Sequence, residues 1–112
     1  MTSSLRLKND RALSLPISTY SLEFLLEAKK EYDRLDKSIQ LQLLKKLRSR
    51  LSEPRVSADK LRGMADCYKI KLRASGIRLV YEVIDRRLVI TVIAIGRREN
   101  DAVYDSAKKR IR

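Results

Sequence analysis

The chain has 112 residues, which is enough for one domain with a modest hydrophobic core but not for two. Its 26 Lys and Arg against 14 Asp and Glu give a formal net charge of +12, which indicates either a surface that only aids solubility or a polyanionic partner: nucleic acid, a ribonucleoprotein, an anionic membrane or an acidic protein. It contains no histidine, so histidine acid–base pairs, Ser-His-Asp triads and His-containing zinc sites are excluded, and any catalysis must use Lys, Arg, Tyr or carboxylates.

The chain begins with a segment of no clear hydrophobic period. Residues 1–17 are expected to form a flexible basic leader or to come from an upstream alternative start, with a single domain at residues 18–112. The leader has no continuous apolar stretch, so we do not expect it to act as a secretory signal. No apolar run elsewhere is long enough to span a bilayer, so we expect no membrane partner.

A strand and two helices follow the leader. Tyr20, Leu22 and Phe24 alternate as in a half-buried strand. A first helix is predicted from the apolar spacing of Leu25, Ala28, Tyr32 and Leu35. Asp36 is the expected N-cap of a second helix, which Pro54 ends. The apolar positions of this second helix are Ile39, Leu43, Leu44, Leu47 and Leu51.

The segment Cys67–Arg73 alternates apolar and basic side chains at period 2. A β-strand places Tyr68, Ile70 and Leu72 on one face and Lys69, Lys71 and Arg73 on the other. A row of three cations repels itself, which indicates a polyanion nearby.

Cys67 is the only cysteine and has no partner for an internal disulfide, which fits a reducing cytoplasm. Without a histidine to activate it, Cys67 is expected to be a small strand residue rather than a nucleophile.

Two further strands are expected at Tyr68–Arg73 and Ile77–Ile84, and they are expected to pair through a two-residue turn at Ser75-Gly76. This register adds Arg78 to the basic row and makes the opposite face a continuous apolar surface for the helices. The predicted pairs are Arg73 with Arg78, Lys71 with Val80, Lys69 with Glu82, Leu72 with Leu79, Ile70 with Tyr81, and Tyr68 with Val83.

The last strand, Leu88–Ile95, is apolar on both faces and is therefore predicted to be central in the sheet, with Gly96 ending it. Asn100 or Asp101 is expected to cap a final helix. That helix has a narrow apolar stripe with Tyr104 on its shoulder, and the stripe consists of Val103, Ala107 and Ile111.

Five residues form a candidate catalytic set: Lys69, Lys71, Arg78, Arg98 and Tyr104. Such a set supports cleavage of RNA by its own 2′-hydroxyl, which needs a base, cations that stabilise the charged phosphorane, and an acid for the 5′-oxygen. Lysine, with a free pKa of ~10.4, is a poor base at neutral pH. Crowding by neighbouring cations is expected to lower the pKa of Lys71.

The same residues have a simpler interpretation. Alternating Lys and Arg on a half-exposed strand is usually a solvated face, and Tyr104 alone is more often an aromatic at the edge of a core. From the residues alone, a basic nucleic-acid-binding domain is favoured over a nuclease.

Four segments, in this order and spacing, resemble the RelE branch of the RelE/ParE toxin superfamily: Leu61–Met64, Cys67–Arg73, Ser75–Tyr81, and Gly96–Glu99 with Val103 and Tyr104. The resemblance covers residues 18–112 and implies an α+β fold, a small antiparallel sheet packed against an N-terminal helical hairpin with a C-terminal helix. It also implies an mRNA interferase, the toxin of a bacterial type II toxin–antitoxin pair. Such a toxin cuts mRNA in the ribosomal A site and leaves a 2′,3′-cyclic phosphate and a 5′-hydroxyl.

The resemblance assigns roles to the candidate set. Lys71 is the expected general base, with Lys69 supporting it. Arg78 stabilises the phosphate in the transition state, Arg98 assists the leaving 5′-oxygen, and Tyr104 orients the substrate by stacking.

The resemblance also implies partners: ribosomal RNA, mRNA and a RelB-like antitoxin that wraps the toxin in an oligomeric complex. The basic surface is expected to dock ribosomal RNA through Lys45, Lys46, Arg48, Arg62 and Arg73. No metal or cofactor is expected. Two alternatives remain, a ParE-type poison of DNA gyrase and a non-enzymatic basic binding module.

Overall fold

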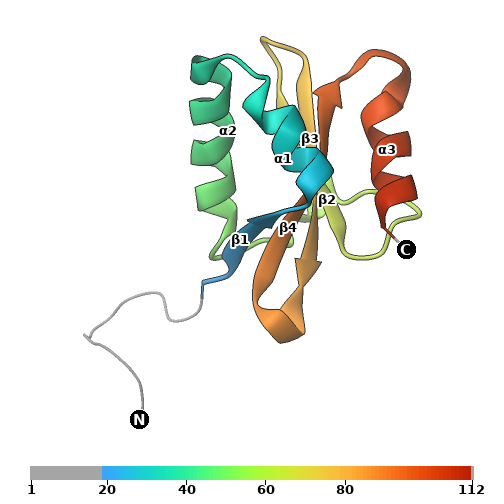
Figure 1. The fold of residues 1–112 in the computed structure, drawn as a ribbon. Helices are drawn as coiled ribbons and strands as arrows, with labels where there is room; N and C mark the ends of the chain where they lie inside the picture. The colour runs from blue at the N-terminus through green and yellow to red at the C-terminus, as the bar shows by residue number, and fades with distance from the viewer. Residues whose placement is uncertain (1–18, 112) are drawn as a thin grey trace.

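The structure is a computed structural model that describes residues 19–111, and it has an α+β fold (Figure 1). The predicted leader of residues 1–17 lies outside the described residues, so the domain boundary stays a prediction. The strands are β1 (Ser21–Phe24), β2 (Cys67–Leu72), β3 (Ile77–Ile84) and β4 (Val89–Arg97), and the helices are α1 (Leu26–Asp33), α2 (Lys37–Arg50) and α3 (Ala102–Arg110). Within the described residues, no helix is long and apolar enough to cross a membrane.

The four strands form one sheet in the order β1-β4-β3-β2, which places β4 inside the sheet as its apolar pattern predicts. β2, β3 and β4 are antiparallel neighbours, but β1 pairs parallel with β4, from Ser21 opposite Val89 to Phe24 opposite Val92. The prediction of an antiparallel sheet is therefore wrong at this edge. An alternating pattern gives the face of each residue but not the direction of its strand. The parallel pairing is possible because two helices and two strands separate β1 from β4.

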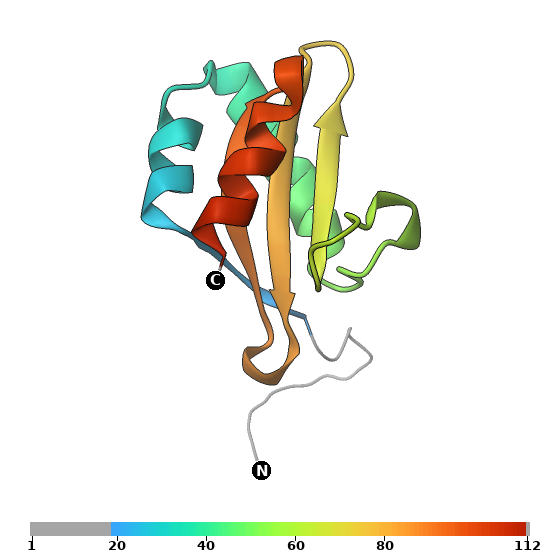
Figure 2. The same ribbon diagram turned by 90° about the vertical axis from the view of Figure 1, so that its right-hand side faces the viewer.

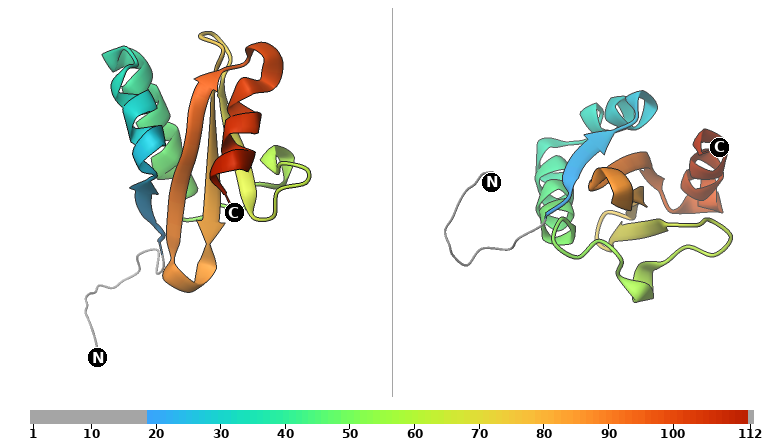
Figure 3. Two further views of the ribbon diagram at one scale, coloured as in Figure 1. Left: turned by 45° about the vertical axis from the view of Figure 1, so that its right-hand side comes forward. Right: turned by 90° about the horizontal axis from the view of Figure 1, so that it is seen from below.

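Helices cover both faces of the sheet: α1 and α2 lie on one side and α3 on the other (Figure 3). The larger core lies under α1 and α2 and includes Leu43, Leu47, Ile70, Leu79 and Tyr81. The smaller core lies under α3 and includes Cys67, Val80, Ile93, Val103 and Ala107.

β4 contains a β-bulge at Ile93. Val80 pairs with Ala94, and the next residue of β3, Tyr81, pairs with Val92, so Ile93 has no partner on β3. A bulge places two successive residues on the same face. Ile93 and Ala94 accordingly both belong to the core under α3.

The predicted register of β2 with β3 is wrong by two residues. Leu72 lies opposite Ile77 and Lys71 opposite Arg78, so the connection is residues 73–76 rather than a two-residue turn. Gly76 takes a positive φ of 74° and donates its N–H to the Leu72 carbonyl at 2.9 Å, which closes a longer turn. A slip of two residues keeps every side chain on its predicted face. It also moves Arg78 from beside Arg73 to directly across from Lys71.

Asp36 is the N-cap residue of α2 as predicted, although it makes no side-chain capping bond, and α2 ends at Arg50, ahead of Pro54. The prediction that Gly96 ends the last strand is wrong. β4 continues through Gly96 to Arg97. A Cβ on Gly96 would lie 3.4 Å from the Cβ of Val103, so α3 packs closely on β4 at this glycine.

Candidate active site

The face of the sheet that carries α3 is only partly covered. α3 packs on β4 and β3, while β2 lies beside it at the edge (Figure 2). Lys69 and Lys71 of β2 and Arg78 of β3 alternate with residues of the core under α1 and α2, so their side chains are on the α3 side. All three are half-buried.

Three elements bring candidate site residues together here. Lys71 is directly opposite Arg78, a position in which cross-strand Cβ atoms are roughly 5 Å apart. Arg78 Nη1 donates a hydrogen bond to the hydroxyl of Tyr104 on α3 at 3.2 Å. Lys69 precedes Lys71 by two residues and lies on the same face of β2. The structure thus assembles lysine, arginine and tyrosine from β2, β3 and α3.

Arg98 reaches the same end of the sheet through its backbone. Its N–H donates to the carbonyl of Gly76 at 2.9 Å, which joins the segment before α3 to the turn between β2 and β3. Arg97 Nη1 donates to the carbonyl of Ser75 at 3.2 Å and fastens the same pair of segments. The Arg98 side chain is exposed. Arg73, also exposed, begins that turn.

We call Lys69, Lys71, Arg78 and Arg98 the basic face. Among the described residues, none of these four forms an ion pair with a carboxylate, whereas five other cations do. Those five are Lys29, Arg50, Arg55, Arg87 and Arg110. Like charges directly opposite each other in a sheet destabilise it. A phosphate of RNA would supply the missing negative charge, and arginine binds phosphate with two parallel hydrogen bonds.

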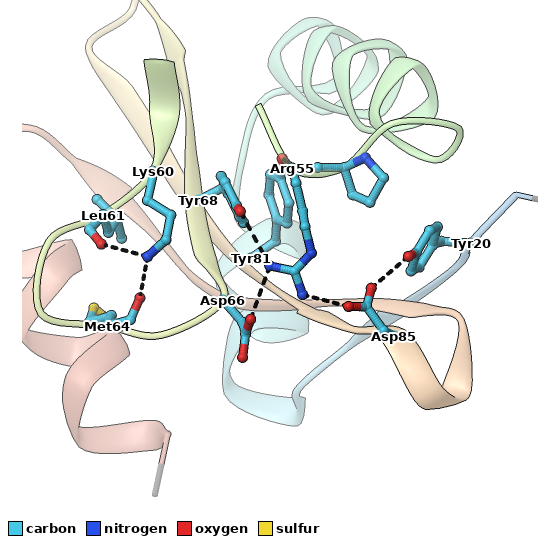
Figure 4. Close-up of polar contacts among 10 residues, drawn as sticks. Tyr20, Arg55, Lys60, Leu61, Met64, Asp66, Tyr68, Tyr81 and Asp85 are labelled. Carbon is cyan, nitrogen blue, oxygen red and sulfur yellow. Dashed lines mark hydrogen bonds and ion pairs between the residues drawn. The ribbon is translucent and has the colours of Figure 1, made fainter. Parts of the chain in front are cut away.

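The other end of β2 has the opposite character. Arg55 donates to Tyr68 at 3.3 Å, pairs with Asp66 at 3.0 Å and with Asp85 at 2.9 Å (Figure 4). Asp85 also accepts from the hydroxyl of Tyr20 at 2.6 Å. The hydrogen bonds from Tyr20 and Arg55 lower the pKa of the Asp85 carboxyl. We call these five residues the Arg55 network. Its cation, Arg55, joins separate segments of the chain.

The residues predicted to bind RNA do not form one cluster. Arg73 is adjacent to the basic face, whereas Arg62 is exposed in the loop before β2, at the strand's other end. Lys45 and Lys46 line a shallow hollow with Leu72, on the α2 side of the β2 edge. Arg48 is exposed on α2. Cations therefore lie on both sides of the edge strand β2.

Cys67 is fully buried in β2, under α3. Burial, followed by the nearby charges of Glu82 and Asp66, raises the pKa of its thiol to about 12. A reactive thiolate is therefore not formed near neutral pH. This supports the prediction that Cys67 is a packing residue.

One contact of the α3 helix has no signal in the sequence. Arg110 binds Glu31 through both guanidinium nitrogens, at 2.9 and 3.0 Å. The two residues are 79 positions apart, and neither belongs to a recognisable motif. From the sequence, Arg110 is only one of several cations that suit the C-terminal end of a helix.

Known proteins share this fold and much of this sequence. The family described as the ParE toxin of type II toxin-antitoxin systems matches residues 22–102, more than half of the chain. A protein of Escherichia coli named mRNA interferase toxin RelE is 54% identical over 92 residues, which cover 82% of this chain and 97% of that protein. Another E. coli protein, named a putative RelE-like toxin, is 53% identical over 93 residues, or 83% and 98% of the two chains.

Solved structures agree. A variant of the E. coli RelE toxin in the free state matches with a TM-score of 0.79 and 52% identity, and the match covers 84% of this chain and 99% of that chain. RelE in the intact E. coli RelBE toxin–antitoxin complex matches with a TM-score of 0.70 and 53% identity, over 72% and 99% of the two chains. The chain therefore belongs to the RelE family of toxins, within the wider RelE/ParE group.

Proposed function

We propose that this protein is the toxin of a type II toxin–antitoxin pair and an endoribonuclease that cuts mRNA in the ribosomal A site, thereby inhibiting translation. The observation that carries the proposal is the basic face, where Lys71 lies opposite Arg78 and Arg78 binds Tyr104. These cations have no carboxylate partner among the described residues. The chain is also 54% identical to a protein named an mRNA interferase.

The proposed reaction is a transesterification within the RNA, in which the 2′-oxygen replaces the 5′-oxygen on the phosphorus. A base removes the 2′-proton, the 2′-oxygen attacks the adjacent phosphorus, and the bond to the 5′-oxygen breaks as that oxygen takes a proton. The products are a 2′,3′-cyclic phosphate and a 5′-hydroxyl. Negative charge builds on the phosphorane, where preformed cations stabilise it most.

Each residue of the set has a place in this reaction. Lys71 is the proposed base, with Lys69 beside it on β2. Arg78 binds the phosphorane, and its hydrogen bond fixes the Tyr104 ring at the site, where the ring stacks on a base. Arg98, on the exposed segment before α3, assists the 5′-oxygen.

Docking on the ribosome uses the wider basic surface. Lys45 and Lys46 reach the β2 edge from the α2 side, and Arg73 extends the basic face at the turn. Arg48 and Arg62 add exposed cations farther along the surface. Binding to ribosomal RNA through such contacts weakens steeply with salt. Because translating ribosomes are cytoplasmic, we propose that this activity is cytoplasmic too.

The proposed inhibitor is a RelB-like antitoxin. The E. coli relative RelE forms a toxin–antitoxin complex, RelBE, whose structure has been solved. By analogy, an acidic antitoxin wraps this toxin, blocks ribosome entry and forms an oligomeric complex. The net charge of +12 favours a partner of opposite charge.

The test is primer extension on an mRNA in a translating extract. Wild-type toxin should produce cuts at codons held in the A site, and Arg78→Ala and Arg98→Ala should lose them. Arg86→Ala is the matched control, because Arg86 is an exposed arginine on the hairpin between β3 and β4, away from the basic face. Cleavage that persists in both site variants contradicts the assignment of the site.

A gyrase poison is the second candidate, because the matching family carries the ParE name. A supercoiling assay with purified gyrase separates the two functions. Inhibition of gyrase without any RNA cut would replace the first proposal. Ribosome binding without a cut would leave only a basic binding module.

A further inference from the structure

The β4 edge is open beyond the end of β1. Pairing between the two strands stops at Phe24 opposite Val92, although β4 continues to Arg97. The bulge at Ile93 lies immediately after this point. Backbone groups at such a place have lost a neighbouring strand, and leaving them buried without partners is costly.

Two side chains supply the missing partners. The N–H of Ile95 donates to Glu31 Oε1 at 3.0 Å, and Arg110 Nη1 donates to the carbonyl of Ile93 at 2.9 Å. The guanidinium of Arg110 and the carboxylate of Glu31 also bind each other through two parallel hydrogen bonds. Their side chains are only 19% and 26% exposed. We call this arrangement the Glu31–Arg110 clamp.

The clamp links three elements, α1, α3 and β4. Glu31 belongs to α1 and binds Ile95 of β4, whereas Arg110 is the last residue of α3 and binds Ile93 at the bulge. A helix of nine residues such as α3 is marginal without tertiary contacts. At its C-terminal end, Ala107 is buried and Ile111 packs against the same core, and the clamp adds a polar anchor to these apolar contacts.

The position of α3 on the sheet matters for the candidate site because α3 carries Tyr104. The hydroxyl of Tyr104 meets Arg78 at 3.2 Å, near the outer limit for such a bond. Val103 lies against Gly96 at the N-terminal end of α3 and the clamp holds the C-terminal end, so these two contacts together set the position of the helix on the sheet. A small shift of α3 would break the contact between Tyr104 and Arg78.

We propose that the Glu31–Arg110 clamp is a positioning device for the active site: it seats α3 on the β4 bulge and thereby holds Tyr104 against Arg78. The inference rests on the proposed endoribonuclease function. Arg110 touches no substrate in this scheme and acts only through the placement of Tyr104.

A double-mutant cycle tests the coupling. Arg110→Ala is expected to lower kcat for ribosome-dependent cleavage on the order of tenfold with KM nearly unchanged, because the reacting groups are misplaced while docking cations remain. In a Tyr104→Ala background, the same change should cost less than about threefold, because no tyrosine remains to be placed. Arg110→Lys keeps the charge but not the fork of two bonds, and should stay impaired. Lys109→Ala, at an exposed neighbour, should match wild type.

Amide hydrogen exchange on the purified toxin provides a readout independent of cleavage. Arg110→Lys, and Arg110→Ala where it folds, should speed exchange in residues 102–110 while leaving β2 and β3 unchanged. Unchanged exchange in α3 would overturn the inference whatever the cleavage result. An equal loss of kcat from Arg110→Ala with and without Tyr104 would overturn it too, with the proposed function intact. Cleavage that survives Tyr104→Ala would instead refute the role of Tyr104, and this inference with it.

Discussion

The two ends of β2 show opposite uses of positive charge. At the end near the β2–β3 turn, Lys71 faces Arg78 across the sheet, and the basic face has no carboxylate partner among the described residues. At the other end, Arg55 is held by two carboxylates and a tyrosine. The cations behind the net charge of +12 therefore include, among the described residues, some that carboxylates neutralise and others, such as the basic face, that have no carboxylate partner.

The contrast follows from what each arrangement costs. A cation with a carboxylate partner is neutralised in place, and its hydrogen bonds link separate segments. Two cations placed opposite each other repel, which raises the free energy of the free folded protein. An anion that binds between them relieves this repulsion. We therefore expect substitutions at the two ends to have different effects: loss of activity at the basic face, loss of stability at the paired cations.

The largest effect is expected at the proposed base. Lys71→Arg keeps the positive charge of the basic face but removes a group able to lose its proton, because arginine stays protonated at any physiological pH. Cleavage in a translating extract should fall by about 10²- to 10⁴-fold. Ribosome binding, measured by sedimentation, should change by less than twofold. A variant that cuts normally would show that Lys71 acts only as a charge.

A paired cation should give the reverse result. Arg50 donates to Tyr81 at 2.8 Å and to Asp59 at 2.7 Å, with its side chain 16% exposed. Arg50→Ala should lower the free energy of unfolding by about 2 kcal/mol, the order expected for losing hydrogen bonds to a charged group. Urea denaturation measures this, with the exposed Arg34→Ala as control. Cleavage per folded molecule should stay within twofold of wild type.

Sequence periodicity was sufficient to predict where the strands lie in the chain and which residues of β2 and β3 share a face. β3 begins and ends where predicted, and β2 and β4 do so within two residues. The faces predicted for β2 and β3 are right because a slip of two residues does not alter them. This placed Lys69, Lys71 and Arg78 together even though the predicted turn was wrong.

What the sequence could not supply depends on contacts distant in the chain. The parallel direction of β1 is set against β4, and the bulge at Ile93 appears only when β4 meets β3. The pairing of Arg110 with Glu31 spans 79 positions. Whether a given arginine is neutralised is therefore invisible in its local pattern, although that property separates the two ends of β2.

A smaller effect should reveal the repulsion itself. Lys69→Gln removes one of the clustered cations, so the free energy of unfolding should rise by roughly 0.2–0.5 kcal/mol at low salt. The gain should vanish near 1 M NaCl, where surface charges are screened within ~3 Å. Arg55→Gln, at the other end of β2, should destabilise under the same conditions. A loss of stability in Lys69→Gln would show that this lysine has a partner.

The smallest effect is a pH dependence that belongs only to the paired end. Hydrogen bonds from Tyr20 and Arg55 lower the pKa of Asp85 below its value in the unfolded chain, which is about 3.9. A carboxyl with a depressed folded pKa contributes stability above the unfolded pKa and loses it as pH falls through the folded pKa. The difference in unfolding free energy between wild type and Asp85→Asn should therefore be constant from about pH 5 to 8 and shrink below about pH 4.

Urea denaturation at several pH values measures this difference. Asp85 is 58% exposed, so solvent screening keeps the effect modest. Asp36→Asn is the control, because the Asp36 side chain makes no capping bond. Lys71→Arg should follow the wild-type curve throughout, since the basic face has no carboxylate to protonate among the described residues. A difference between wild type and Asp85→Asn that persists unchanged at low pH would show that the Arg55 network does not depend on the charge of Asp85, and would remove the proposed distinction between the two ends of β2.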